Sequence, residues 1–318
     1  MPLPFGLGVL NGLLARGVFP RWLPKPALRP TTRSASGAAV RITWWGTAAH
    51  VFSTGTTTVL LDPFLSRPGL LDVGLLPLRP NEAALRPHLP HKVDAILLGH
   101  SHYDHLMDAP TLARWTGAKL VGSRSTVSFA RAEGVAESQL VEIPAEGGHV
   151  TVGDIEVRFV PSRHGRIFAG RVPFPGEVPT PPRVPARVSA YKMGGAFGIV
   201  MRAPGATVYH NGSADLVDAE LAGESADVLL VGLAGRQATP GYLRRLAGLL
   251  RPKLIVPTHH DAFFAPLADG LRLLPGIDLD GFEQEARDVA HEARLITPAH
   301  LEVLAVPPHD ARASALVA

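Results

Sequence analysis

The most informative segment of the chain reads His100-Ser101-His102-Tyr103-Asp104-His105, with four strong metal-binding side chains within six residues. It follows residues 93–98, a short apolar run typical of a buried strand. A loop at a strand end can direct both histidines of the H-x-H part into one pocket, and the next turn can bring Asp104 and His105 to a neighbouring point. Imidazoles and a carboxylate suit zinc, with ligand bonds of about 2.0–2.2 Å. A polar surface loop seldom shows such a density of ligands, so the segment predicts a metal site.

The H-x-H-x-D-H pattern after a strand resembles the metal-binding motif of the metallo-β-lactamase superfamily. The resemblance covers about residues 40–305. Within it, Ile42-Thr43-Trp44-Trp45-Gly46 and Leu60-Leu61-Asp62-Pro63-Phe64-Leu65 look like the opening of the branch that includes ascorbate-phosphate lactonase and N-acyl phosphatidylethanolamine phospholipase D. The resemblance implies an α/β fold, the four-layer αββα metallo-β-lactamase sandwich.

Further metal ligands are implied by the same resemblance. His100, His102 and His164 would bind one metal ion, because Pro161-Ser162-Arg163-His164 matches the place of the third histidine after a later strand. Asp104 and His105 would bind a second ion together with His259, and His260 ranks behind His259 for this role. Two Zn²⁺ ions per chain are expected, although these ligands also accept iron or manganese.

One position departs from the family pattern. Relatives carry Gly-Asp after the fourth strand, and that aspartate bridges the metals, whereas here the sequence is Gly212-Ser213-Ala214-Asp215. Ser213 takes the bridging position, Asp215 is the favoured replacement if the turn is wider, and Asp261 is another candidate. Asp62 would orient a ligand histidine through its other ring nitrogen, or be a plain turn residue before Pro63.

The function implied is that of a metal-dependent hydrolase. Metal ions lower the pKa of a bound water toward ~7, and the resulting metal-bound hydroxide would attack an ester, lactone or amide. Asp104 would be a ligand and the catalytic residue that helps to orient the hydroxide. A phosphodiesterase or phospholipase D-like hydrolase is one alternative, and a metal-binding member without hydrolytic activity, favoured by Ser213, is another. The chain has no G-x-S-x-G elbow, which argues against a serine hydrolase.

Residues 163–187 hold five arginines and a single acidic residue, together with many prolines. One hypothesis is a stiff loop at the active site, in which Arg166 and Arg171 bind an anionic group and Phe168 an apolar one. The alternative is a proline-rich surface excursion with solvated arginines. The expected partner is a small-molecule substrate, anionic or lipid-like.

Composition limits the other possibilities. The chain has no cysteine, which excludes disulfides and thiolate ligands, and a net charge of +3 over 318 residues is too small to indicate nucleic-acid binding. No apolar run reaches the ~18 residues needed to span a membrane, and a cytoplasmic, bacterial protein is expected. Residues 1–39 form an N-terminal extension and linker before a hydrolase domain over residues 40–318. Residues 1–14 are apolar; they are expected to dock or fray, or alternatively to contact a membrane surface.

The order of elements favours two sheets covered by helices, because strand pairs come early and strands alternate with helices later. Strands are expected at residues 40–45, 57–61, 93–98, 119–121, 155–160, 196–201, 207–209, 228–231 and 254–256. Helices are expected from Asp108 to near Gly117, over residues 127–133, from Thr239 to Leu250, and over residues 282–294.

Overall fold

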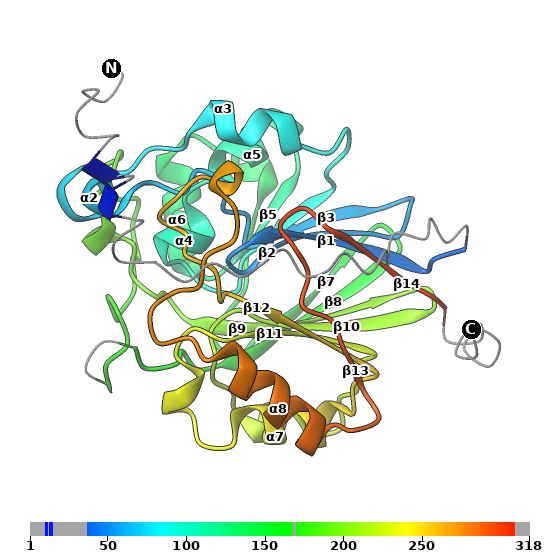
Figure 1. Cartoon of the computed structure of the whole chain (residues 1–318). Coiled ribbons are helices and arrows are strands. Elements are labelled where there is room, and N and C mark those ends of the chain that lie inside the picture. The colour runs from blue at the N-terminus through cyan, green and yellow to red at the C-terminus, as the bar shows by residue number, and fades with distance from the viewer. Residues whose placement is uncertain (1–9, 12, 15–36, 168–169, 309–318) are drawn as a thin grey trace.

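The fold is a stack of two β-sheets with helices on the outer face of each (Figure 1). It is taken from a computed structural model that describes residues 10, 11, 13, 14, 37–167 and 170–308. Each sheet has seven strands. The layers therefore run helix, sheet, sheet, helix, as the sequence predicts.

The first sheet is built mainly from the first half of the chain. In sheet order its strands are β14 (Val303–Val306), β1 (Val40–Gly46), β2 (Ala49–Ser53), β3 (Thr58–Leu61), β4 (Ala95–Leu97), β5 (Lys119–Gly122) and β6 (Leu140–Glu142). The pairs from β14 to β3 are antiparallel, and those from β3 to β6 are parallel.

The second sheet has the same division into antiparallel and parallel parts. In sheet order its strands are β13 (Arg294–Leu295), β12 (Leu254–Thr258), β11 (Val228–Gly232), β10 (Ala206–Asn211), β9 (Ala196–Ala203), β8 (Ile155–Ser162) and β7 (Gly148–Val152). The pairs from β13 to β10 are parallel, and those from β10 to β7 are antiparallel.

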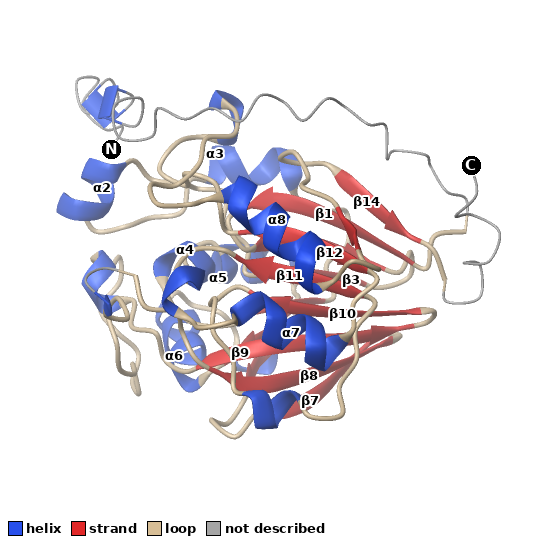
Figure 2. Ribbon diagram, turned by 60° about the horizontal axis from the view of Figure 1, so that its bottom comes forward, coloured by secondary structure: helices blue, strands red, loops and turns tan. Residues whose placement is uncertain are grey.

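Helices pack against both outer faces. The α-helices are α2 (Leu70–Leu75), α3 (Glu82–Leu85), α4 (Tyr103–Leu106), α5 (Ala109–Thr116), α6 (Arg124–Ala132), α7 (Tyr242–Leu250) and α8 (Leu279–Val289). Short 3-10 helices cover Arg86–His88, Glu137–Gln139, Val188–Ala190, Asp218–Leu221, Arg236–Ala238 and Leu267–Asp269. Helices α4, α5 and α6 cover the first sheet, whereas α7 and α8 cover the second (Figure 2).

Side chains along the strands alternate between the two faces of each sheet. The apolar ones form three layers, one between the sheets and one on the outer face of each sheet. In β3, Val59 and Leu61 face the core between the sheets, and Leu60 faces the helices outside. In β10, Val208 faces the other sheet and Tyr209 packs under α7 and α8. Successive side chains of a strand point to opposite faces, so strands buried on both faces are continuously apolar, which is the pattern the sequence shows.

The helix ends follow local chemistry. α5 ends at Gly117, which adopts a left-handed φ of 73° as a helix-ending glycine does. α7 buries Leu243, Leu246 and Leu250 on one stripe, as their spacing predicts.

Two expectations about elements are corrected. Residues 65–90, where no strand or helix is expected from the sequence, contain α2 and α3. The last helix begins and ends earlier than residues 282–294, because Asp278 caps it by accepting the Gly281 N–H. Arg294 instead begins β13, where it pairs with Leu254.

The N-terminal segment is described only at four positions, so most of the segment predicted to dock or to contact a membrane lies outside the described residues. Among the helices that are described, none has the length and hydropathy needed to cross a bilayer.

Candidate metal centre

The loop after β4 places the histidine-rich motif. The Gly99 N–H donates to Asp62 Oδ1 at 2.7 Å, and the Ser101 hydroxyl donates to the Lys192 carbonyl at 2.6 Å. Ser101 is therefore held by the segment around Lys192, and the residues on either side of it, His100 and His102, turn their rings toward each other and toward His164. His102 then precedes the first turn of α4, which carries Asp104 and His105.

The second sheet supplies the other two histidines. His164 follows β8 and forms an isolated bridge with Ala214. His259 follows β12 in a left-handed conformation with φ of 54°, and its N–H donates to the Thr47 carbonyl at 2.7 Å. Both β4 and β12 lie in the parallel parts of their sheets, and ligands commonly bind outside the carboxyl ends of such strands.

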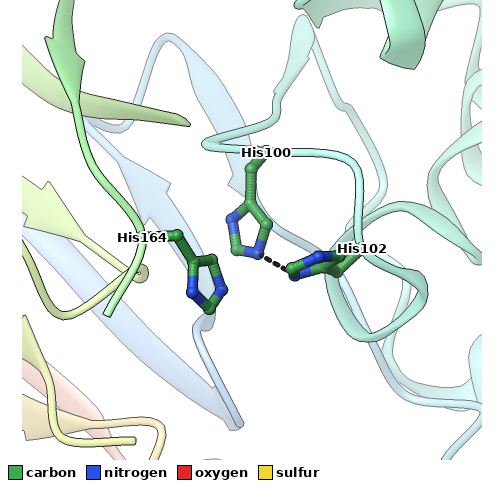
Figure 3. Close-up of side chains that lie close together, drawn as sticks. All are labelled: His100, His102 and His164. Carbon is green, nitrogen blue, oxygen red and sulfur yellow. Dashed lines mark hydrogen bonds between the residues drawn. The ribbon is translucent and has the colours of Figure 1, made fainter. Parts of the chain in front are cut away.

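The first ligand group is His100, His102 and His164, whose candidate ligand atoms lie within 4.8 Å of one another (Figure 3). His100 Nε2 is 3.0 Å from His102 Nδ1. His102 Nε2 lies 2.8 Å from the Pro173 carbonyl, and His164 Nδ1 lies 2.7 Å from the Gly165 carbonyl. A carbonyl only accepts, so these two nitrogens carry the protons, and the opposite nitrogens keep free lone pairs for a metal.

The second group is Asp104, His105 and His259, again within 4.8 Å. Asp104 Oδ2 lies 3.2 Å from His259 Nε2 and 3.7 Å from His105 Nε2. His105 Nδ1 is 3.0 Å from Asp62 Oδ2, which leaves Nε2 directed at the group. The ring centroids of His100 and His105 are only 3.9 Å apart, so the two groups adjoin.

Electrostatics favours neutral rings in the first group and an ionised carboxylate in the second. Burial lowers the pKa of His102 to about 4 and that of His164 to about 3, with neighbouring histidines adding to the effect. Burial alone would raise the pKa of Asp104, but His105 and His259 hold it below its usual range.

These residues fit a metal. Within the described part of the chain, His105 Nε2 is a buried ring nitrogen without a hydrogen-bond partner, and it faces Asp104 of the second group. Buried polar atoms in proteins are normally satisfied, so an unpartnered imidazole nitrogen beside a carboxylate and further histidines suits a divalent cation.

Asp62 lies behind the second group, as the sequence predicts. Its Oδ2 also lies 2.9 Å from His210 Nε2. The side chains of Asp62, His105 and His210 are all fully buried or nearly so. His210 is not among the residues that the sequence predicts for the site. The available clue is a histidine inside the apolar strand β10.

Asp215 is not brought to either ligand group. Asn211 Oδ1 accepts the N–H groups of Ser213 and Ala214, both at 3.1 Å, and this closes a tight turn rather than the wider one that Asp215 needs. The Asp215 carboxylate instead accepts the Leu216 N–H at 2.7 Å.

Ser213 also turns away, because its hydroxyl donates to the Arg163 carbonyl at 3.0 Å. Gly212 passes close to the metal groups: a Cβ on it would lie 3.1 Å from Asp62 Oδ2 and 3.2 Å from His105 Cε1. Neither Ser213 nor Asp215 therefore supplies a carboxylate between the two groups.

His260 and Asp261 pack and pair with residues around the site and are not placed as metal ligands. His260 is fully buried and stacks on Trp44 with ring centroids 4.8 Å apart. Asp261 pairs with buried Arg67, and its Oδ2 lies 2.9 Å from His300 Nε2. Its carboxylate is thus engaged by Arg67 and His300 and does not face the ligand groups. Arg67 and His300 are further residues that the sequence does not predict.

A pocket of about 860 Å³ opens over the two groups. His102, Asp104, His164 and His259 line it, and so does Arg166. Arg171 is exposed and is not part of the lining, and Phe168 lies outside the described residues. The structure therefore brings one of the two predicted arginines to the site.

Known proteins match this chain in sequence and in fold. Residues 57–260 match the family model described as the beta-lactamase superfamily domain. A UPF0173 metal-dependent hydrolase from Anaeromyxobacter sp. (strain K) is 31% identical over 238 residues, which cover 72% of this chain and 77% of that protein.

Solved structures agree with the fold. Igni18, a metallo hydrolase from the archaeon Ignicoccus hospitalis, has a TM-score of 0.53 at 20% identity, covering 83% of this chain and 97% of that chain. CmlA, a diiron β-hydroxylase from Streptomyces venezuelae, has a TM-score of 0.55 at 16% identity, covering 84% of this chain and 54% of that chain.

The family match includes the H-x-H-x-D-H motif, His164 and His259, which are the residues that the fold gathers into the two groups. Relatives of the chain are named metal-dependent hydrolases. The chain belongs to the metallo-β-lactamase superfamily and is a metal-dependent hydrolase of that fold.

Proposed function

We propose that the chain binds two zinc ions, one in each ligand group, and hydrolyses a carboxylic ester, lactone or amide of a small molecule. The observation that carries the proposal is the pair of adjoining three-residue groups at the base of one pocket. Three protein ligands are the number typical of catalytic zinc, because a further position stays open for water or substrate.

The side chains have distinct roles in this reaction. Zinc in these groups would lower the pKa of a coordinated water and polarise the carbonyl of the substrate. Asp104 stays ionised beside His105 and His259, so its carboxylate can accept a hydrogen bond from the attacking water and orient it. Hydrolysis places the hydroxyl of water on the acyl carbon, breaks the C–O or C–N bond, and delivers the proton to the leaving group.

A phosphodiesterase or phospholipase D-like reaction is the second candidate. The observation in its favour is Arg166, a residue of the pocket lining whose guanidinium suits a phosphate anion. Arg171 provides a matched control, because it is an exposed arginine of the same loop outside the lining. If phosphodiesters are the substrates, Arg166→Ala reduces their turnover and Arg171→Ala does not.

The first test is the metal content of the purified protein by elemental mass spectrometry. We expect two metal ions per chain in the wild type, and loss of one in His164→Ala and of the other in His259→Ala. Asp215→Ala is the control and should keep both, because its carboxylate faces the Leu216 N–H. The preparation is then assayed on esters, lactones, amides and phosphodiesters. Fewer than two ions in the wild type, or turnover of phosphodiesters alone, would overturn the proposal.

A further inference from the structure

The pocket over the ligand groups is large for the chemistry at its base. Its volume of about 860 Å³ lies toward the upper end of the ~300–1,000 Å³ typical of ligand pockets. The two metal groups occupy only its base, and the walls come from α2, the loop after β8, and the segments around residues 234–238 and 263–277.

One wall is aromatic and begins at a candidate metal ligand. The Phe263 ring packs edge-on against His259, with centroids 5.4 Å apart, and stacks on Phe264 at 4.6 Å. Leu274 and Ile277 extend this wall. An apolar surface therefore runs from the reacting position outward.

Another part of the lining is α2, which has no fully buried residue. Its Leu70 and Val73 are half-buried and line the pocket. The helix is held by polar contacts: Asn11 Nδ2 donates to Asp72 Oδ2 at 3.0 Å, and Asn11 Oδ1 accepts the Leu71 N–H at 3.0 Å. Because these contacts are on other residues of the helix, the apolar side chains of Leu70 and Val73 remain available to a ligand.

Polar side chains are scarce between these walls. Outside the ligand groups, the described residues of the lining include only Tyr103, Arg166 and Gln237 with polar side chains. Gln237 is already engaged, since its Nε2 donates to the Gly276 carbonyl at 3.0 Å. A sugar or nucleotide would lose its hydrogen bonds with water and find few replacements here, whereas an apolar group loses none.

We propose that the substrate carries an extended apolar acyl chain, which packs against α2 and the wall of Phe263 and Phe264 while its carbonyl lies over the metal groups. This inference rests on the proposed ester, lactone or amide hydrolysis. Burial of each added methylene in such a pocket raises kcat/KM by up to about fourfold.

Gly74 offers a test that spares the core. It lines the pocket from α2, has an ordinary backbone conformation, and nothing lies within 4 Å of a Cβ built on it. Gly248 in α7 also has nothing within 4 Å of such a Cβ, and it is not part of the lining. Gly74→Trp therefore fills the pocket, and Gly248→Trp is its matched control.

The experiment compares kcat/KM of the metal-loaded protein for p-nitrophenyl acetate, butyrate and octanoate. We expect a steep rise with chain length in the wild type and in Gly248→Trp, and at least a tenfold fall in the octanoate-to-acetate ratio in Gly74→Trp. Equal values for acetate and octanoate in the wild type would overturn the inference.

A binding measurement separates this inference from the proposed function. Anilinonaphthalene sulfonate is bound to the metal-free protein, and its displacement by octanol or by ethanol is followed by fluorescence. Displacement by octanol only, and its loss in Gly74→Trp, supports the apolar pocket even if no ester is hydrolysed. Hydrolysis of acetate and octanoate at equal rates, without displacement by octanol, removes the acyl-chain inference and leaves the hydrolase proposal intact.

Discussion

Asp108 is a carboxyl group enclosed by the protein beside the metal-binding helix. It is fully buried, and it accepts hydrogen bonds from the Leu65 N–H at 2.7 Å and the Ser66 N–H at 2.8 Å. Burial outweighs these bonds and raises the pKa of Asp108 to about 6. A raised folded pKa means that the stability from this group is complete below the unfolded pKa of 3.8 and is lost as pH rises through 6.

Asp108→Asn should remove this pH dependence, because its amide oxygen can accept the same two N–H groups and it cannot ionise. We expect similar free energies of unfolding for the two proteins near pH 4, and an advantage for the variant on the order of 3 kcal/mol at pH 7. Urea unfolding across this range measures the difference. A difference that does not change with pH would show that Asp108 does not titrate there.

At the scale of single residues, the sequence predicts those ligands whose neighbours in the chain carry the pattern. His100, His102, Asp104 and His105 follow one strand, and His164 and His259 each follow another. Their supporting partners depend on tertiary contacts instead. Asp62 and His210 are 148 residues apart, and Arg67 and Asp261 are 194 apart. No local pattern joins such pairs.

Among the elements, the loop after β12 depends on a buried ion pair. Asp261 in this loop accepts the Thr47 N–H at 2.7 Å and pairs with Arg67, whose side chain is 1% exposed. Burial alone would raise the pKa of Asp261, but Arg67 holds it well below its usual range. His259 lies two residues before Asp261, so the same contacts fix the place of this candidate ligand.

Arg67→Met should therefore weaken both the fold and one metal group. Removing one partner of a buried pair costs about 3–5 kcal/mol, since the other charge stays buried. We expect that loss in the free energy of unfolding, together with preferential loss of the metal ion of the His259 group. The control is Arg245→Met, which breaks a partly exposed pair with Asp218 and should cost ~1 kcal/mol or less. Full metal occupancy in Arg67→Met would contradict the positioning role.

The strands and helices show the same contrast: those with a local sequence pattern are predicted, and those that depend on tertiary contacts are missed. β8, β9, β10 and α7 follow long apolar periodicities and agree closely with expectation. β2 is missed because only Thr47 and Ala48 separate it from β1, and these are not the residues that usually form a two-residue hairpin turn. Thr47 adopts a φ of 51° that is held by its contacts with the loop after β12.

In the whole molecule, both ligand groups connect the two sheets. His100, His102, Asp104 and His105 come from the loop and helix after β4 in the first sheet, whereas His164 and His259 come from the second. A metal ion in either group therefore joins the halves of the sandwich, and it binds the folded state alone.

Metal removal should consequently lower the Tm. A ligand at 1,000 times its Kd stabilises the folded state by about 4 kcal/mol per site. We expect a chelator to lower the Tm measured by calorimetry and zinc to restore it. A doubly substituted His164→Ala, His259→Ala protein should respond to neither. If the Tm of the wild-type protein did not change on addition of the chelator, the idea that bound metal ions hold the two sheets together would be contradicted.

The pairing of β1 with β14 has a consequence for chain connectivity. Val40 lies opposite Val306, and the Ala39 N–H donates to the Val306 carbonyl at 2.9 Å. The two ends of the sandwich are thus neighbours, so a short linker could close it into a ring that is reopened at the exposed Glu146 turn between the sheets. In such a circular permutant, His164 and His259 would precede His100 in the chain while every strand kept its neighbours. The metal centre is specified by which strands pair, and the order in which they are synthesised can change.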